Sequence, residues 1–193
     1  MLTLYSYPSL FGVADNNGYG LKVFAFLRLA GVAFQHEHIF DAQRHTDHLV
    51  TRLLDHLYWV MSYSRWKDER YWPAFRDALL REHPQLNEEG LLKVKEHNAL
   101  RYHYQGIGRY EPDAAMARGV ADLQAIASLV PESGYVHGDR PGSIDAGIYG
   151  FIANIYFYDS DTPLKQCVAA HASLVRHCHA LHAAVSVAVS PEA

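Results

Sequence analysis

The chain is poor in cysteine, in net charge and in long hydrophobic runs, and each shortage excludes a class of protein. Only two of its 193 residues are cysteine, too few for a disulfide scaffold and typical of a reducing compartment. The formal net charge of −4 argues against nucleic acid as a partner. No apolar run approaches the roughly 20 residues that cross a bilayer, and no secretory signal is visible. We therefore expect a cytoplasmic protein without nucleic-acid or membrane partners.

What remains is an ordinary globular composition. Hydrophobic residues make up 49% of the chain and charged residues 20%, which excludes disorder, collagen and coiled coil as descriptions of the whole chain. The length suits one large domain or two small ones, and it is enough to bury a hydrophobic core without the help of disulfides or metal ions.

The first 40 residues predict a single β-α-β unit. Residues 2–7 alternate as in a strand, and a loop rich in glycine and asparagine follows. Residues 21–30 form an apolar helix that Gly31 ends, and residues 32–40 form a second strand. Because a helix joins the strands, they should run parallel. The helix has little polar surface, so we expect it to be covered on more than one side.

The sequence after residue 41 has a pattern that predicts helices throughout. Apolar residues recur there at spacings of three and four. The predicted segments are residues 45–64, 66–80, 88–105, 112–130, 144–158 and 164–185. The fold class is therefore α+β, a small β-α-β front followed by a bundle of five or six helices, and that alone names no activity.

Two stretches carry a resemblance to a known family. The segment LTLYSYP followed by NNGYGLKVFAFLRLAGVAFQHEHI resembles the thioredoxin-like N-terminal domain of the glutathione S-transferase superfamily. The segment HGDRPGSIDAGIYGFIANI resembles the all-helical C-terminal domain of that superfamily. LDHLYWVMSYSRW and GIGRY look like the metaxin and failed-axon-connections branch. The resemblance implies an abridged thioredoxin-like part over residues 1–42 and a glutathione S-transferase C-terminal-like helical domain over residues 43–193.

The front departs from the family pattern, either by a natural or engineered deletion or because a disordered segment is absent from the sequence. A complete thioredoxin-like half has two further strands and a helix, roughly 35–40 residues by average element lengths. Here residues 41–43 lead directly into the first long helix. The family's cis-proline turn and its acidic residue followed by serine, which hold glutathione, have no counterpart in this sequence.

The resemblance places a glutathione site at the start of the first helix. A transferase must hold the thiol as a thiolate, which a helix N-terminus and a hydroxyl or amide donor both favour. The implied glutathione-binding residues are Asn16, Asn17, Gly18 and Tyr19, with Tyr5 or Asn17 as the catalytic group that orients the sulfur. The alternative is that Asn17 only caps the helix and Tyr5 packs in the core.

Asp145 has a structural interpretation. It is the third residue of a predicted helix whose N-cap is Gly142, so it can accept the N-cap N–H and form half of a capping box. Replacement by alanine should then cost about 1 kcal/mol or somewhat more.

Two further clusters are open to two interpretations each. His177, Cys178, His179 and His182 lie at helical spacing and could bind zinc, although solvated histidines are the more common outcome and no metal site is predicted. The aromatic run from Tyr58 to Phe75 could line an electrophile pocket, or it could fill a core or a dimer contact.

The leading hypothesis is a glutathione S-transferase-like protein, expected to form a homodimer. If it is an enzyme, it joins glutathione, its co-substrate, to a small hydrophobic electrophile. The alternative is a non-catalytic binding or assembly module that keeps the fold.

Overall fold

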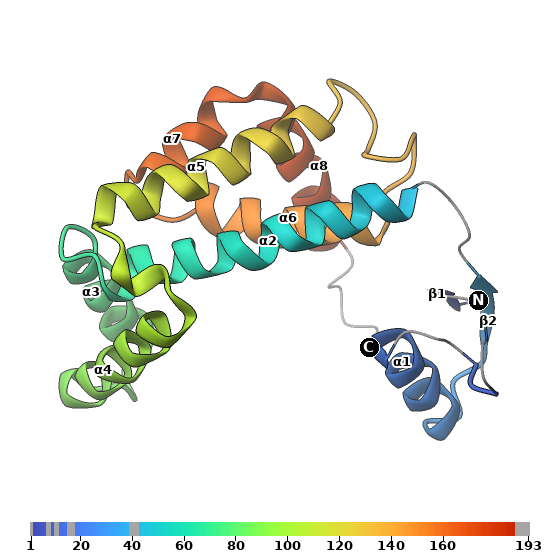
Figure 1. Ribbon diagram of the computed structural model, residues 1–193, viewed down its shortest axis with the longest axis horizontal. Coiled ribbons are helices and arrows are strands. Elements are labelled where there is room, and N and C mark those ends of the chain that lie inside the picture. Colours follow the sequence, from blue (N-terminus) through green and yellow to red (C-terminus); the bar gives the residue numbers. More distant parts are fainter. Residues whose placement is uncertain (1, 7–8, 10–11, 15–17, 39–42, 188–193) are drawn as a thin grey trace. The chain divides into compact units, whose positions relative to one another are not determined.

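The computed structural model describes residues 2–6, 9, 12–14, 18–38 and 43–187 of the chain (Figure 1). The chain divides into two compact units, Met1–His48 and Leu49–Ala193. In the described part of the chain, no helix combines the length and the apolarity needed to cross a membrane.

The first unit contains a parallel strand pair and one helix. Strand β1 (Leu2–Ser6) pairs with strand β2 (Phe34–His38), in a register that places Leu2 opposite Phe34. Helix α1 (Gly18–Leu29) is the crossover, so the predicted β-α-β unit and its parallel pairing are confirmed. Gly31 has a φ of +68°, a left-handed conformation that suits glycine just beyond a helix C-terminus.

Helix α1 contacts the sheet through one face. The rings of Phe24 and Phe34 meet edge to face with centroids 5.5 Å apart, and the guanidinium of Arg28 lies 5.2–5.3 Å from both. The opposite face is open, since Phe26 is 67% exposed and Leu29 89%. The expectation that this helix is covered on more than one side is therefore wrong, because two strands supply only one covering surface.

The rest of the described chain is helical. Its elements are α2 (Gln43–Trp66), α3 (Trp72–Glu82), α4 (Glu88–Gln105), the 3-10 turn η1 (Ile107–Arg109), α5 (Pro112–Leu129), α6 (Ser143–Tyr156), α7 (Pro163–Ala170) and α8 (Ala172–Val187). The described chain is thus mostly helical with a small N-terminal sheet, which is consistent with a glutathione S-transferase-like α+β fold whose thioredoxin part is abridged.

The predicted helix at residues 164–185 is two helices. Helix α7 ends at Ala170, and the imidazole Nδ1 of His171 donates a hydrogen bond of 2.7 Å to the carbonyl of Cys167. This side chain satisfies a carbonyl that a continuous helix would bond through its backbone. The sequence has no glycine or proline at this break, and its apolar residues keep their helical spacing across it. The pattern therefore predicts one continuous helix.

The helix predicted at residues 66–80 begins at Trp72, six residues after its predicted start. Asp68 is almost fully buried and its backbone carbonyl accepts the N–H groups of both Tyr71 and Trp72. The carboxylate also accepts the N–H of Arg70. Asp68 therefore organises a turn between α2 and α3 where periodicity alone predicts helix.

The core of the helical unit comes mainly from α2 and α5–α8, with Tyr102 of α4 and Ile107 of η1 also buried in it. Its fully buried aliphatic side chains are Val50, Leu57, Val60, Leu123, Ile126, Ile148, Ile152, Leu164, Val168 and Leu174. At Gly119 on α5, an added Cβ would lie 2.7 Å from Val60 of α2 and 2.8 Å from Leu164 of α7. A glycine at this position lets three helices pack closely.

Candidate functional site

The structure describes only some of the predicted glutathione-binding residues. Tyr5 lies in β1 opposite Glu37 of β2 and is 61% exposed, so it does not pack in a core. Gly18 is the first residue of α1. Asn16 and Asn17 lie outside the described residues, as does the side chain of Tyr19. The cradle of amides that these residues would form therefore stays a prediction.

Asp145 is the best-connected carboxylate of the helical unit. It is fully buried near the start of α6, and its oxygens accept the N–H of Val136 at 3.0 Å, the N–H of Gly142 at 2.8 Å and Nε2 of His177 at 2.9 Å. Burial by itself raises the pKa of Asp145, but these hydrogen bonds outweigh it and leave the pKa below its ordinary value.

The contacts of Asp145 extend its predicted role. Gly142 has no side chain, so the capping box has only the half that Asp145 supplies, as predicted. The other two donors have no local signal in the sequence, because Val136 lies in an irregular loop and His177 lies on α8, 32 residues away. Asp145 therefore joins three segments of the chain, and the three hydrogen bonds that it accepts all come from groups of the fold.

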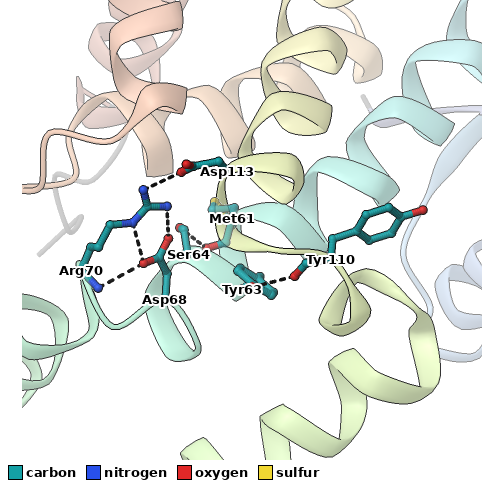
Figure 2. Close-up of polar contacts among 7 residues, drawn as sticks. All are labelled: Met61, Tyr63, Ser64, Asp68, Arg70, Tyr110 and Asp113. Atoms are coloured by element: carbon teal, nitrogen blue, oxygen red, sulfur yellow. Dashed lines mark hydrogen bonds and ion pairs between the residues drawn. The ribbon is translucent and has the colours of Figure 1, made fainter.

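A cavity of about 600 Å³ lies where the α2–α3 turn faces the start of α5. Figure 2 shows the guanidinium of Arg70 between two carboxylates, 2.7 Å from Asp68 and 2.6 Å from Asp113. Hydrogen bonds to Asp68 and Asp113 raise the pKa of Arg70. In the same view the Tyr63 hydroxyl donates to the carbonyl of Tyr110 at 3.2 Å. These polar groups are paired with one another, which indicates a clamp between helices rather than a ligand site.

A second polar pair, His56 and Asp122, was missed at the sequence level. Nδ1 of His56 on α2 donates to the carboxylate of Asp122 on α5, across 66 residues of chain. His56 also lines a cavity of about 340 Å³ with Arg109, Arg118 and the end of α4. The carboxylate fixes the orientation of the imidazole, which leaves Nε2 on the far side of the ring.

The histidine and cysteine cluster of α8 does not converge on one point. His177 bonds Asp145, Cys178 is fully buried, His179 stacks near Phe157, and His182 bonds the hydroxyl of Tyr149. In the chain as described, no group of three histidine, cysteine or carboxylate side chains could hold a metal ion.

The aromatic run of α2 and α3 is divided among several environments. Tyr63 and Trp72 are buried, and burial raises the pKa of the Tyr63 hydroxyl. The Trp66 ring packs on Trp72 and Phe75, with centroids 5.4 and 5.2 Å away. Most of the run therefore packs within the helical unit, and Phe75 reaches a surface cavity.

Comparison with known proteins finds a similarity over part of this helical unit. Residues 119–181 match a family model described as glutathione S-transferase, C-terminal domain. That segment is glutathione S-transferase-like. It includes Asp145 and His177, so the buried pair belongs to the part of the chain that matches. No curated protein and no solved structure matches the chain.

Proposed function

We propose that this chain is a glutathione S-transferase-like protein that binds glutathione at the start of α1 and joins it to a small hydrophobic electrophile. The observation that carries the proposal is the match of residues 119–181 to the glutathione S-transferase C-terminal domain. Membership of the metaxin and failed-axon-connections branch, and a cytoplasmic location, are parts of the same proposal.

The chemistry requires a stabilised sulfur anion. Free backbone N–H groups at the start of α1 (Gly18–Leu29) and a hydroxyl or amide donor would lower the pKa of the glutathione thiol. The thiolate would then attack the electrophilic carbon and form a carbon–sulfur bond, while the leaving group departs with its electron pair. The exposed hydroxyl of Tyr5 and the amide of Asn17 are the proposed donors to the sulfur.

Binding and turnover can be tested separately. The protein is passed over immobilised glutathione, its melting temperature is measured with millimolar glutathione, and a chromogenic electrophile is assayed. We expect retention, an upward shift in melting temperature and turnover that Tyr5→Phe or Asn17→Ala reduces. Asn87→Ala, which removes the cap of α4, serves as a control far along the chain. A folded sample with neither binding nor turnover would contradict the enzyme proposal.

The second candidate is a non-catalytic binding or assembly module. The open face of α1 favours it, because Val23, Phe26 and Leu29 are 44%, 67% and 89% exposed, and apolar patches of this kind often mark contacts between proteins. It predicts a stable homodimer or partner complex, read by light scattering, with no glutathione-dependent change in melting temperature. Phe26→Ser should weaken that assembly, whereas Lys22→Ser should not.

A further inference from the structure

An aromatic cavity lies at the surface of the helical unit, apart from any residue assigned to glutathione. Its volume is about 390 Å³, and the side chains that define it are Arg65, Phe75, Tyr149, Phe157, Tyr158 and His182. They come from the end of α2, from α3, from α6 and the residues after it, and from α8. Sites for single small molecules have volumes of this order and are lined mainly by apolar and aromatic groups.

Arg65 supplies a positive charge to this cavity. Its Nη2 donates to the carbonyl of Asn154 at 2.6 Å, and its guanidinium carbon lies 4.7 Å from the ring centroid of Tyr158 and 5.8 Å from that of Phe75. Burial lowers the pKa of Arg65, but a guanidinium stays protonated at neutral pH. The two rings and one carbonyl are therefore the neighbours of a permanent cation.

The charge of Arg65 has no counter-ion in the part of the chain that the structure describes. Among the described residues no carboxylate forms an ion pair with it, although Arg70, five residues on, has two. The Nε of Arg65 and the hydroxyl of Tyr158 are both buried, and no described residue forms a hydrogen bond with either. Partly buried charges and buried polar groups are normally paired, so the guanidinium of Arg65 is a group that an anion would suit.

The walls of the cavity favour a flat ring. Phe157 is 46% exposed, and its ring lies 4.8 Å from that of His182 in a tilted arrangement. Nδ1 of His182 and the hydroxyl of Tyr149 are 2.9 Å apart, which holds both side chains in place at the rim. An exposed aromatic ring beside two fixed ones offers a stacking surface.

We infer that this cavity binds a small aromatic carboxylate, with the ring against Phe157 and Tyr149 and the carboxylate on the guanidinium of Arg65. Arginine binds carboxylates through two parallel N–H groups. Nε of Arg65 is buried in this structure, so binding requires the Arg65 side chain to turn toward the cavity, where Nε and one Nη can meet the same carboxylate. The site selects for a negative charge beside the ring, whatever the outcome for glutathione.

The test compares three probes on the unaltered protein by titration calorimetry and ligand-observed NMR. 4-Hydroxybenzoate carries ring and charge, 4-hydroxybenzamide keeps the ring without the charge, and acetate keeps the charge without the ring. We expect 4-hydroxybenzoate to bind at least about tenfold more tightly than either of the others, as one charge-assisted bidentate contact implies. Equal affinity for the benzamide, or absence of binding by 4-hydroxybenzoate at 10 mM (roughly −3 kcal/mol or weaker), overturns the proposal.

Variants locate the site. Arg65→Met keeps most of the alkyl stem and removes the charge, and it should weaken 4-hydroxybenzoate binding by about tenfold or more. Arg52→Met, at an exposed arginine earlier on α2, is the matched control and should leave binding unchanged. Phe157→Ala should weaken binding of both ring-containing probes. If Arg65→Met binds as the unaltered protein does, the proposal is wrong; if that variant does not fold, the benzoate and benzamide comparison and Phe157→Ala still decide it.

Discussion

The replacement Asp145→Ala tests how much the buried hydrogen bonds of Asp145 stabilise the helical unit. It removes an acceptor that serves two backbone N–H groups and one imidazole N–H, all within 3.0 Å. Asp145 and His177 both have side chains with no exposed surface, so water cannot replace the lost partner without opening the structure. The loss is therefore larger than that of a solvent-exposed helix cap.

The magnitude follows from those contacts. A buried donor left without a partner costs about 1–3 kcal/mol, and removal of one member of a buried hydrogen-bonded pair costs about 3–5 kcal/mol. We expect Asp145→Ala to lower the free energy of unfolding by about 3–5 kcal/mol, several times the value of about 1 kcal/mol for an ordinary cap. For a chain of this size that corresponds to a fall in melting temperature of about 6–20 °C.

Urea unfolding followed by circular dichroism measures the change. Asp139→Ala, at an exposed carboxylate of the same loop, is the control and should stay within about 0.5 kcal/mol of the unaltered protein. Asp145→Asn keeps one acceptor oxygen and should fall between the two. A loss of less than about 1 kcal/mol for Asp145→Ala, or a loss equal to that of the control, would refute the reasoning.

Three further expectations follow from the same structure. Because hydrogen bonding holds the pKa of Asp145 below its ordinary value, the stability that Asp145 contributes is present above about pH 4 and is lost as pH falls through the lowered pKa. The difference in unfolding free energy between the unaltered protein and Asp145→Asn should therefore shrink between pH 5 and pH 3 (roughly the range in which a carboxylate titrates). A difference that stays constant over this range would contradict the expectation. Gly119→Ala should lower the free energy of unfolding by about 1–3 kcal/mol, because the added Cβ meets Val60 and Leu164. Gly150→Ala should leave the free energy of unfolding unchanged or raise it by up to about 1 kcal/mol, because the added Cβ meets nothing within 4 Å. A larger loss of stability in Gly150→Ala than in Gly119→Ala would be evidence against this packing. Burial raises the pKa of Cys178 to about 11, so a thiol reagent should label it only after unfolding, and rapid labelling of the folded protein at neutral pH would show that α8 opens.

The elements that sequence predicted well are those whose signals are local. The helix at residues 88–105 was predicted with its observed bounds, since Asn87 caps it and Gly106 ends it in a left-handed conformation. Likewise, the parallel strand pair follows from a helical crossover alone. Such signals are contained within a few residues, so no knowledge of the rest of the chain is needed.

The features that sequence missed depend on contacts between distant segments. The break at His171 arises because an imidazole replaces a backbone donor, and nothing in its neighbours shows that the side chain turns back. The pairs Asp145–His177 and His56–Asp122 join residues 32 and 66 positions apart. That no described carboxylate pairs with Arg65 also depends on the fold, because it is the fold that places the carboxylates near Arg70 instead. Phe157 and Tyr158, which follow α6, line a cavity with Arg65 of α2, although they lie about 90 residues from it in the chain.

The partners of Asp145 also set an order of events during synthesis of the chain. The loop N–H groups are available as soon as residue 145 is made, but His177 follows 32 residues later. Until α8 leaves the ribosome, the carboxylate at the start of α6 stays hydrated and the neighbouring loop is held by only part of its contacts. Docking of α8 then closes the last hydrogen bond and excludes water, so a nascent chain arrested before residue 177 should be cut readily by proteases between α5 and α6.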